Sequence, residues 1–200
     1  MLEEVGLPYA LRTVNLMKGE QRDPDFLRIS PNNKVPAIVD HDGVDGRTSV
    51  FESGAILVYL AEKTGKLLPT GGRPRSDTLQ WLFWAMAAVG PGIGRFASVA
   101  LFSKNPDSTL VNTLAEEVAR LFGVLERRLS EVEYLAVDYS IADIGAFTWI
   151  AYIRQPIAKY ATLPPVAATD RWLAAIGARP AVQKGLRVPK SAVRPPSMRT

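Results

Sequence analysis

The sequence predicts an α/β segment over residues 1–66, followed by an all-helical segment over residues 75–187. Short apolar runs separated by turn residues fill the first segment, whereas long helical periodicities fill the second. Residues 67–74, rich in Pro and Gly, are predicted to form a linker. A basic, Pro-containing tail at 188–200 has no sustained apolar pattern, and we expect it to be disordered.

The elements of the first segment are short. Ala10–Leu16 alternates apolar and polar residues as a strand does, and residues 25–29 indicate a short turn or helix. Residues 36–39 and 49–51 are brief apolar strands with Asp-Gly turn signals between them. A helix is predicted from Ser53, as its N-cap, to Gly65. This order of strand, helix, hairpin and helix is typical of an α/β domain.

The second segment has helical patterns of greater length. Residues 76–89 are apolar almost all round, and Gly90-Pro91-Gly92 is expected to kink or break that helix. Residues 108–131 repeat apolar residues at steps of three and four, which predicts one long amphipathic helix. Ser140 and Asp143 form a capping-box pattern before an apolar run. Weaker patterns predict two last helices at 167–177 and 180–186.

Composition excludes several kinds of chemistry. The 200 residues contain no cysteine and one histidine, His41, which lies in a predicted turn. A disulfide framework, a cysteine-ligated zinc site and a cysteine nucleophile are therefore excluded, and no metal site is expected. Any thiol chemistry needs a thiol supplied by another molecule.

The location of the charge argues against a nucleic-acid partner. The chain has a formal net charge of +4, but seven of its 24 Lys and Arg residues lie in 171–200, which contain no Asp or Glu. Residues 1–170 therefore carry 17 basic and 20 acidic residues. The excess positive charge belongs to the C-terminal end, which has no aromatic residue other than Trp172 and so lacks the interleaved aromatic residues of a nucleic-acid surface.

Nothing in the sequence predicts a membrane partner. No uninterrupted apolar run approaches the roughly 20 residues of a membrane-spanning helix. The first four residues, Met-Leu-Glu-Glu, are acidic where a signal peptide is basic. We therefore expect a cytoplasmic protein.

Two short segments could bind a ligand. If the bond between Val35 and Pro36 is cis, the backbone of Val35 faces outward and can pair with an extended peptide; the alternative is a trans proline in a β-turn. Ser53 opens a helix whose free N–H groups favour a carboxylate, and Glu52 beside it suits an ammonium group. The pair fits an amino-acid head, although Ser53 could also serve only as a helix cap.

Together these segments resemble the cytosolic glutathione transferase superfamily, and most of all its Ure2-like bacterial nu class, which includes glutathione-dependent disulfide reductases. The similarity extends over residues 1–186 and is carried by residues 18–21, 26–40, 51–57, 59–65 and 79–84, and by Ser140 and Asp143. The resemblance implies a thioredoxin-like N-terminal domain, a helical C-terminal domain and a homodimer.

The resemblance also implies roles for individual residues. The backbone of Val35, before a cis Pro36, pairs with the cysteinyl part of glutathione, while Glu52 and Ser53 hold its γ-glutamyl head. Glutathione acts as a co-substrate in this family. Its thiolate attacks a small electrophile or a small disulfide.

Two further positions match the family pattern and one departs from it. Gln21 corresponds to a nu-class glutathione contact, and Lys34 lies where the glycyl carboxylate could be met. Thr113 stands where nu-class relatives place an arginine near glutathione. We therefore expect a weaker or altered site.

The family's catalytic group has no counterpart in this sequence. Relatives begin with a strand and carry a Tyr, Ser, Cys or Thr/Asn group at the start of the first helix, whereas residues 1–9 resemble the end of that helix. We therefore expect the first strand to be absent, assign no catalytic residue, and expect poor solubility or weak glutathione binding. The alternative is a non-catalytic binding or regulatory module with the same fold.

An aromatic cluster at Trp81, Phe83 and Trp84 leaves three interpretations open. It could line the substrate pocket, form part of the dimer interface, or belong to the core.

Overall fold

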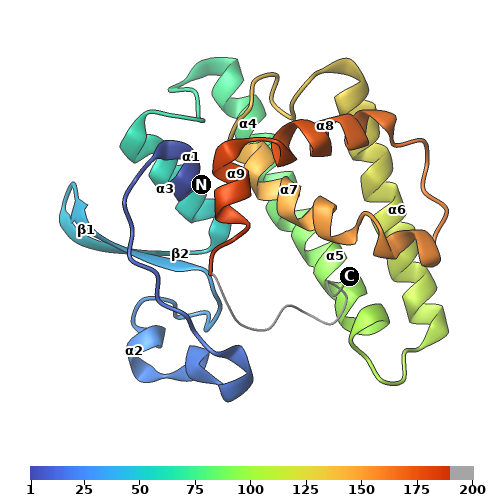
Figure 1. The fold of residues 1–200 in the computed structure, drawn as a ribbon, viewed down its shortest axis with the longest axis horizontal. Helices are drawn as coiled ribbons and strands as arrows, with labels where there is room; N and C mark the ends of the chain where they lie inside the picture. Colours follow the sequence, from blue (N-terminus) through green and yellow to red (C-terminus); the bar gives the residue numbers. More distant parts are fainter. Residues whose placement is uncertain (190–200) are drawn as a thin grey trace.

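The computed structural model describes residues 1–189 and has a small α/β region beside a larger helical region (Figure 1). The predicted tail falls outside the described residues except for Val188 and Pro189. The elements of the α/β region are α1 (Leu2–Val5), η1 (Leu16–Lys18), η2 (Glu20–Arg22), α2 (Pro24–Leu27), β1 (Ala37–Gly43), β2 (Gly46–Phe51) and α3 (Ser53–Thr64).

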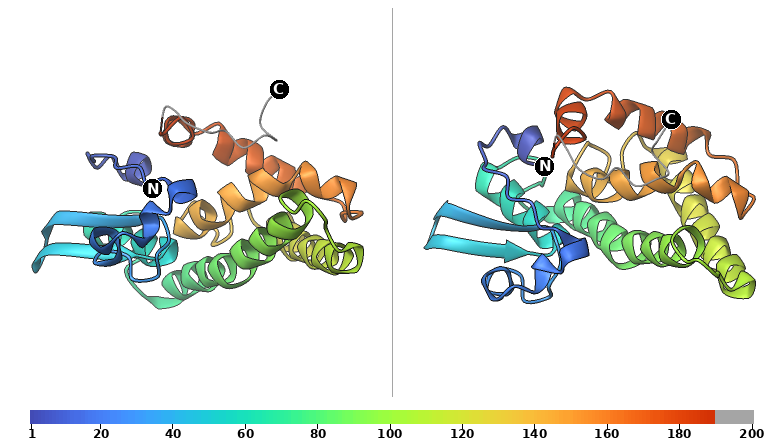
Figure 2. Two further views of the ribbon diagram at one scale, coloured as in Figure 1. Left: turned by 90° about the horizontal axis from the view of Figure 1, so that it is seen from below. Right: turned by 60° about the horizontal axis from the view of Figure 1, so that its bottom comes forward.

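The two predicted strands form one antiparallel hairpin. Ala37 pairs with Phe51 at the open end and Gly43 with Gly46 beside the turn, with an irregular register in between. The hairpin projects from one end of the molecule (Figure 2). Helix α3 packs against both strands, and Asp40 of β1 accepts a hydrogen bond of 2.7 Å from the Tyr59 hydroxyl of α3. Lys63 of α3 pairs with the same carboxylate.

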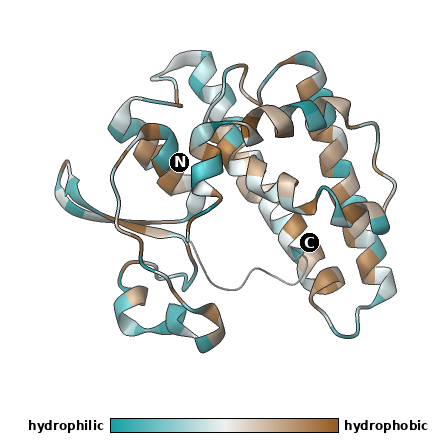
Figure 3. Cartoon of the chain, in the orientation of Figure 1, coloured by the Kyte–Doolittle hydropathy of each residue, from teal (hydrophilic) through white to brown (hydrophobic). Residues whose placement is uncertain are grey.

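The prediction of a strand at Ala10–Leu16 is wrong. This segment is extended but unpaired, and a 3₁₀ turn, η1, begins at its last residue. A strand needs a neighbouring edge, and within residues 1–189 the only sheet contains just β1 and β2, which pair with each other. Leu11 and Leu16 remain about half exposed (53% and 50%). Apolar residues lie on both regions of the molecule (Figure 3).

The helical region contains most of the core. Its elements are α4 (Gly72–Trp84), η3 (Ala85–Val89), α5 (Gly90–Phe96), η4 (Ala97–Leu101), α6 (Ser108–Glu131), α7 (Ile141–Ile153), η5 (Pro156–Lys159), α8 (Ala167–Gly177) and α9 (Pro180–Gly185). Helices α4 and α5 pack against α7, and α5 and α8 pack against α6. The largest fully buried side chains include Phe96, Phe122, Leu125, Ile150 and Trp172.

The sequence predicts a kink or a break at Gly90-Pro91-Gly92, and the break does not occur. Two π-helical turns, η3 and η4, join with α4 and α5 into one helical stretch, Gly72–Leu101. A π turn widens the helix and changes its hydrogen-bond spacing, so the Pro91 ring and its missing N–H are accommodated directly after it. Helix α4 also begins at Gly72, inside the segment predicted as a linker.

This stretch is the one helix among the described residues that is long and apolar enough to cross a membrane by length and composition, a feature that run lengths in the sequence did not predict. It carries core side chains such as Leu82, Val89 and Ile93, which are buried against the other helices. A core helix can meet the same criterion. In this stretch, 33% of the apolar 18-residue window is buried inside the structure.

The long amphipathic helix and the capping box are confirmed. Helix α6 spans Ser108–Glu131, and its apolar face is buried. Ser140 caps α7, and the buried Asp143 carboxylate accepts hydrogen bonds from the backbone N–H of Ser140 at 3.0 Å and of Leu135 at 2.9 Å. The indole N–H of Trp172 donates to it at 2.8 Å. This one carboxylate therefore connects α7, α8 and the segment before α7.

The aromatic cluster divides between core and surface. The rings of Trp81 and Trp84 meet edge to face at 5.2 Å, and both side chains pack against the core. Phe83 is 63% exposed. Core packing therefore accounts for the two tryptophans but not for Phe83.

Candidate functional site

The start of α3 presents the two predicted head-binding residues next to each other. Glu52 is the N-cap of α3, with a positive φ of 67°, and its side chain does not cap the helix. Positive φ is uncommon for a residue with a side chain, and such strain concentrates at functional sites. The backbone N–H groups of the first turn of α3 have no partner within the helix, so they can receive a carboxylate.

Ser53 is the first helical residue and not the N-cap, which corrects the prediction by one position. Its hydroxyl group makes a contact of 3.3 Å with the thioether sulfur of Met86, from η3 in the helical region. Met86 is held close at this point, since a Cβ added to Gly54 would lie only 2.9 Å from its Cγ. The helical region therefore contacts the N-terminal end of α3 directly.

A closed loop presents the second predicted segment. The Ser30 side chain is buried and its hydroxyl donates to the carbonyl of Lys34 at 2.8 Å, while the N–H of Asn33 donates to the carbonyl of Ser30 at 2.9 Å. The Val35–Pro36 bond is cis, as the peptide-pairing interpretation requires. Val35 is 45% exposed, and neither its N–H nor its carbonyl bonds to another backbone group in residues 1–189.

One hydrogen bond connects the loop to the start of α3. The side-chain amide of Asn32 donates to a carboxylate oxygen of Glu52 at 3.0 Å. The loop and the helix start, twenty residues apart in sequence, therefore form one site. Sequence reasoning missed Asn32 because its neighbours, Pro31 and Asn33, are typical turn residues that give no sign of a distant partner.

The other predicted contacts are less tied to this site. Gln21 lies in η2, and its side-chain oxygen is the one buried side-chain polar atom without a hydrogen-bond partner in the described residues. Lys34 is exposed in the loop. Thr113 lies in α6, exposed, with its hydroxyl donating to the carbonyl of Thr109 at 3.1 Å. The assignments of Gln21 and Lys34 remain predictions.

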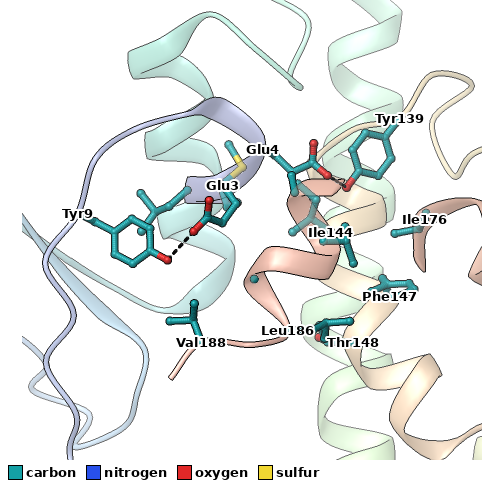
Figure 4. A pocket seen from close by; sticks show the side chains of 15 residues that line it. Glu3, Glu4, Tyr9, Tyr139, Ile144, Phe147, Thr148, Ile176, Leu186 and Val188 are labelled. Atoms are coloured by element: carbon teal, nitrogen blue, oxygen red, sulfur yellow. Dashed lines mark hydrogen bonds between the residues drawn. The ribbon is translucent and has the colours of Figure 1, made fainter. Parts of the chain in front are cut away.

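A cavity of about 320 Å³ lies between α1, α7 and α9 and contains none of the predicted ligand residues (Figure 4). Its walls are mainly apolar, with Ile144, Phe147 and Leu186 among them. Its carboxylates are already engaged. The hydroxyl of Tyr9 donates to Glu3 at 2.7 Å, and Glu4 accepts two hydrogen bonds from Arg179 at 2.8 and 2.9 Å.

The pairing of Glu4 fixes its charge state. Hydrogen bonding to the Arg179 guanidinium lowers the pKa of the Glu4 carboxyl, although burial opposes this. The guanidinium also lies over the Tyr139 ring, 3.8 Å from its centre. The carboxylate is therefore used to join α1 to the helical region, and the cavity offers apolar contact and not polar recognition.

The described residues contain no group of three or more His, Asp or Glu side chains able to hold a metal ion. The site therefore rests on backbone groups, the helix start, one carboxylate and one hydroxyl. This set can bind an extended peptide with an amino-acid head.

Comparison with known proteins agrees with this geometry. The family model for the glutathione S-transferase N-terminal domain matches residues 1–63. The disulfide-bond oxidoreductase YfcG of Escherichia coli K12 is 44% identical over 189 residues, covering 92% of this chain and 86% of that protein.

Solved structures give the same result. A glutathione transferase from Burkholderia graminis, with two glutathione molecules bound per subunit, superposes with a TM-score of 0.90 at 40% identity, covering 96% of this chain and 82% of that one. A glutathione transferase from Pseudomonas putida, with one glutathione disulfide bound per subunit, gives 0.86 at 38% identity over 94% and 84% of the two chains. The chain therefore belongs to the glutathione S-transferase superfamily, among the relatives of the bacterial disulfide-bond oxidoreductases.

Proposed function

We propose that this protein binds glutathione at the start of α3 and uses its thiol in transfer to small electrophiles or reduction of small disulfides. The single observation that carries the proposal is the joined site, in which the exposed Val35 backbone and the Glu52–Ser53 pair are linked through Asn32. A γ-glutamyl head carries an ammonium and a carboxylate on one carbon. Glu52 is matched to the first group, and Ser53 with the helix start to the second.

The rest of the tripeptide has matching groups in the loop. The free N–H and carbonyl of Val35 suit the cysteinyl part, which would bind as an added strand does. The orphaned oxygen of Gln21 can accept a hydrogen bond from a ligand N–H group. Lys34, exposed in the same loop, is a cation that suits the glycyl carboxylate.

The thiol of glutathione supplies the chemistry that this cysteine-free chain lacks. In disulfide reduction, the bound thiolate attacks one sulfur of the substrate disulfide. The substrate S–S bond breaks, a mixed disulfide with glutathione forms, and the other half leaves as a thiolate that takes up a proton. A second glutathione then releases the first half as a thiol and forms glutathione disulfide.

We also propose a homodimer and a cytoplasmic location. The exposed Phe83 of α4 is an aromatic side chain of the kind that subunit interfaces bury. The cytoplasm maintains the reduced glutathione pool that this chemistry consumes. Light scattering of the purified chain measures its oligomeric state directly.

The proposed activity is tested by two assays with glutathione, one on hydroxyethyl disulfide and one on an aromatic halide. We expect turnover in at least one assay, and at least a tenfold lower kcat/KM at subsaturating glutathione in Ser53→Ala, since a hydrogen bond to a charged group is worth about 1.5–3 kcal/mol. Ser49→Ala, an exposed serine on β2, is the matched control. Bound glutathione without turnover of either substrate would contradict the enzyme assignment and favour the binding-module alternative.

A further inference from the structure

In the contact between Asn32 and Glu52, a turn residue donates a hydrogen bond to a side chain twenty residues away. Asn32 lies between the buried Ser30 and the exposed Val35 in the sequence. The loop that contains it is closed by the hydrogen bond from the Ser30 hydroxyl to the Lys34 carbonyl. The Asn32 amide crosses to the α3 start and donates to one carboxylate oxygen of Glu52. The second carboxylate oxygen of Glu52 is left for another donor.

The Glu52 side chain needs a hydrogen bond from another residue to stay in one rotamer. The residue is exposed, its backbone is in the positive-φ region, and its carboxylate does not cap α3. An exposed glutamate otherwise samples several rotamers, and fixing it on binding costs free energy. A hydrogen bond from a residue in a closed loop lowers that cost before the ligand arrives.

We propose that Asn32 is a positioning residue for recognition of the ligand's amino group, acting through Glu52. The inference rests on the proposed glutathione site. It adds Asn32, a residue to which the family resemblance assigns no role. Asn32 orients the carboxylate so that its free oxygen meets the ammonium of the γ-glutamyl head. The neighbouring Ser30 has a different role, since it holds the backbone that leads to Val35.

The role of Asn32 can be distinguished from that of Ser30 with a ligand that lacks only the amino group. The probes are glutathione and glutaryl-cysteinyl-glycine, titrated calorimetrically into the full chain and its variants. Asn32→Ala should weaken glutathione binding about fivefold, a fraction of a full charged hydrogen bond because the contact is exposed. It should change binding of the deamino ligand less than about twofold. Ser30→Ala should weaken both ligands by similar factors.

Two controls complete the design. Asn105→Ala removes an exposed asparagine of the segment between η4 and α6 and should bind both ligands as the wild type does. In a Glu52→Gln background, Asn32→Ala should cause no further loss, because the residue through which it acts has already changed. Melting temperatures of all variants verify that they are folded.

The outcomes distinguish the inference from the proposed function. Equal losses for both ligands in Asn32→Ala, no loss for glutathione, or an additive loss in the double variant would each overturn the positioning role while leaving the glutathione site intact. Failure of the wild-type chain to bind glutathione in the same titration would overturn the proposed function itself.

Discussion

The α/β region and the helical region differ in how completely they bury their side chains. The helical region buries large side chains such as Phe122, Ile150 and Trp172 completely, and a buried carboxylate, Asp143, ties its segments together. The α/β region has a two-stranded sheet and leaves Leu11 and Leu16 half exposed. The residues proposed to bind glutathione nevertheless lie in this weakly packed region. We therefore expect stability and recognition to be carried by different parts of the chain, and substitutions should separate them.

The largest effect is expected at Asp143 in the helical region. Asp143→Ala leaves the N–H groups of Leu135, Ser140 and Trp172 without their buried acceptor, which should lower the free energy of unfolding by about 4 kcal/mol. Urea denaturation followed by circular dichroism measures the change. Asp138→Ala, an exposed aspartate nearby, is the control. A loss no larger than in that control would show that the buried network does not stabilise the helical region.

The junction between the regions should show the next largest effect. Arg179→Ala removes the cationic partner of the nearly buried Glu4 carboxylate, which keeps one hydrogen bond of 3.0 Å from the Tyr139 hydroxyl, and it removes the contact with the Tyr139 ring. We expect a loss of about 3 kcal/mol, because an unpaired charge remains buried. The exposed Arg187→Ala is the control. Equal denaturation midpoints for these two variants would mean that the junction does not couple the regions.

Within the α/β region, the ion pair between β1 and α3 offers a smaller effect with a pH signature. Hydrogen bonds from Lys63 and Tyr59 lower the pKa of Asp40 to about 2, from a usual 3.8. Asp40→Asn should cost about 2 kcal/mol at pH 7. Because the folded-state pKa is depressed, this contribution is fully present above the unfolded-state pKa and is lost as the pH falls from about 4 through about 2.

Denaturation of the wild type and Asp40→Asn at a series of pH values checks this dependence. The difference between them should be constant from pH 7 to about pH 5 and shrink below about pH 4. A difference that stays the same at low pH would contradict an ionic role for Asp40.

The smallest effect is expected for a surface ion pair of the helical region. Arg120 and Glu117 are both well exposed on α6, and their pair lies within one helix. Arg120→Ala should change the free energy of unfolding by less than about 0.5 kcal/mol. A larger loss in the same urea experiment would mean that the stability of this region depends on surface charge as well as on its core.

Prediction from the sequence succeeded where a pattern is local. The bounds of α6 follow from its apolar periodicity, and the box of Ser140 and Asp143 follows from a spacing of three residues. It failed where a distant partner decides the outcome. Ala10–Leu16 has the alternation of a strand but no neighbouring edge in the described residues, and Pro91 follows a π turn that no sequence pattern signals.

The site divides in the same way. Residue types and family resemblance predict a site at Val35, Pro36, Glu52 and Ser53, and the structure places these residues at one loop and one helix start. The contact of Ser53 with Met86 could not be predicted, because it joins residues from two regions with no common motif.

The most direct test of the separation between recognition and stability is a calorimetric titration of glutathione into the wild-type chain and Glu52→Gln, with melting temperatures measured on the same samples. We predict at least about tenfold weaker binding by Glu52→Gln at an unchanged melting temperature, because its neutral amide can accept a hydrogen bond from the ligand ammonium but cannot form an ion pair with it. Equal affinities of the two proteins for glutathione would contradict the assignment of recognition to the start of α3.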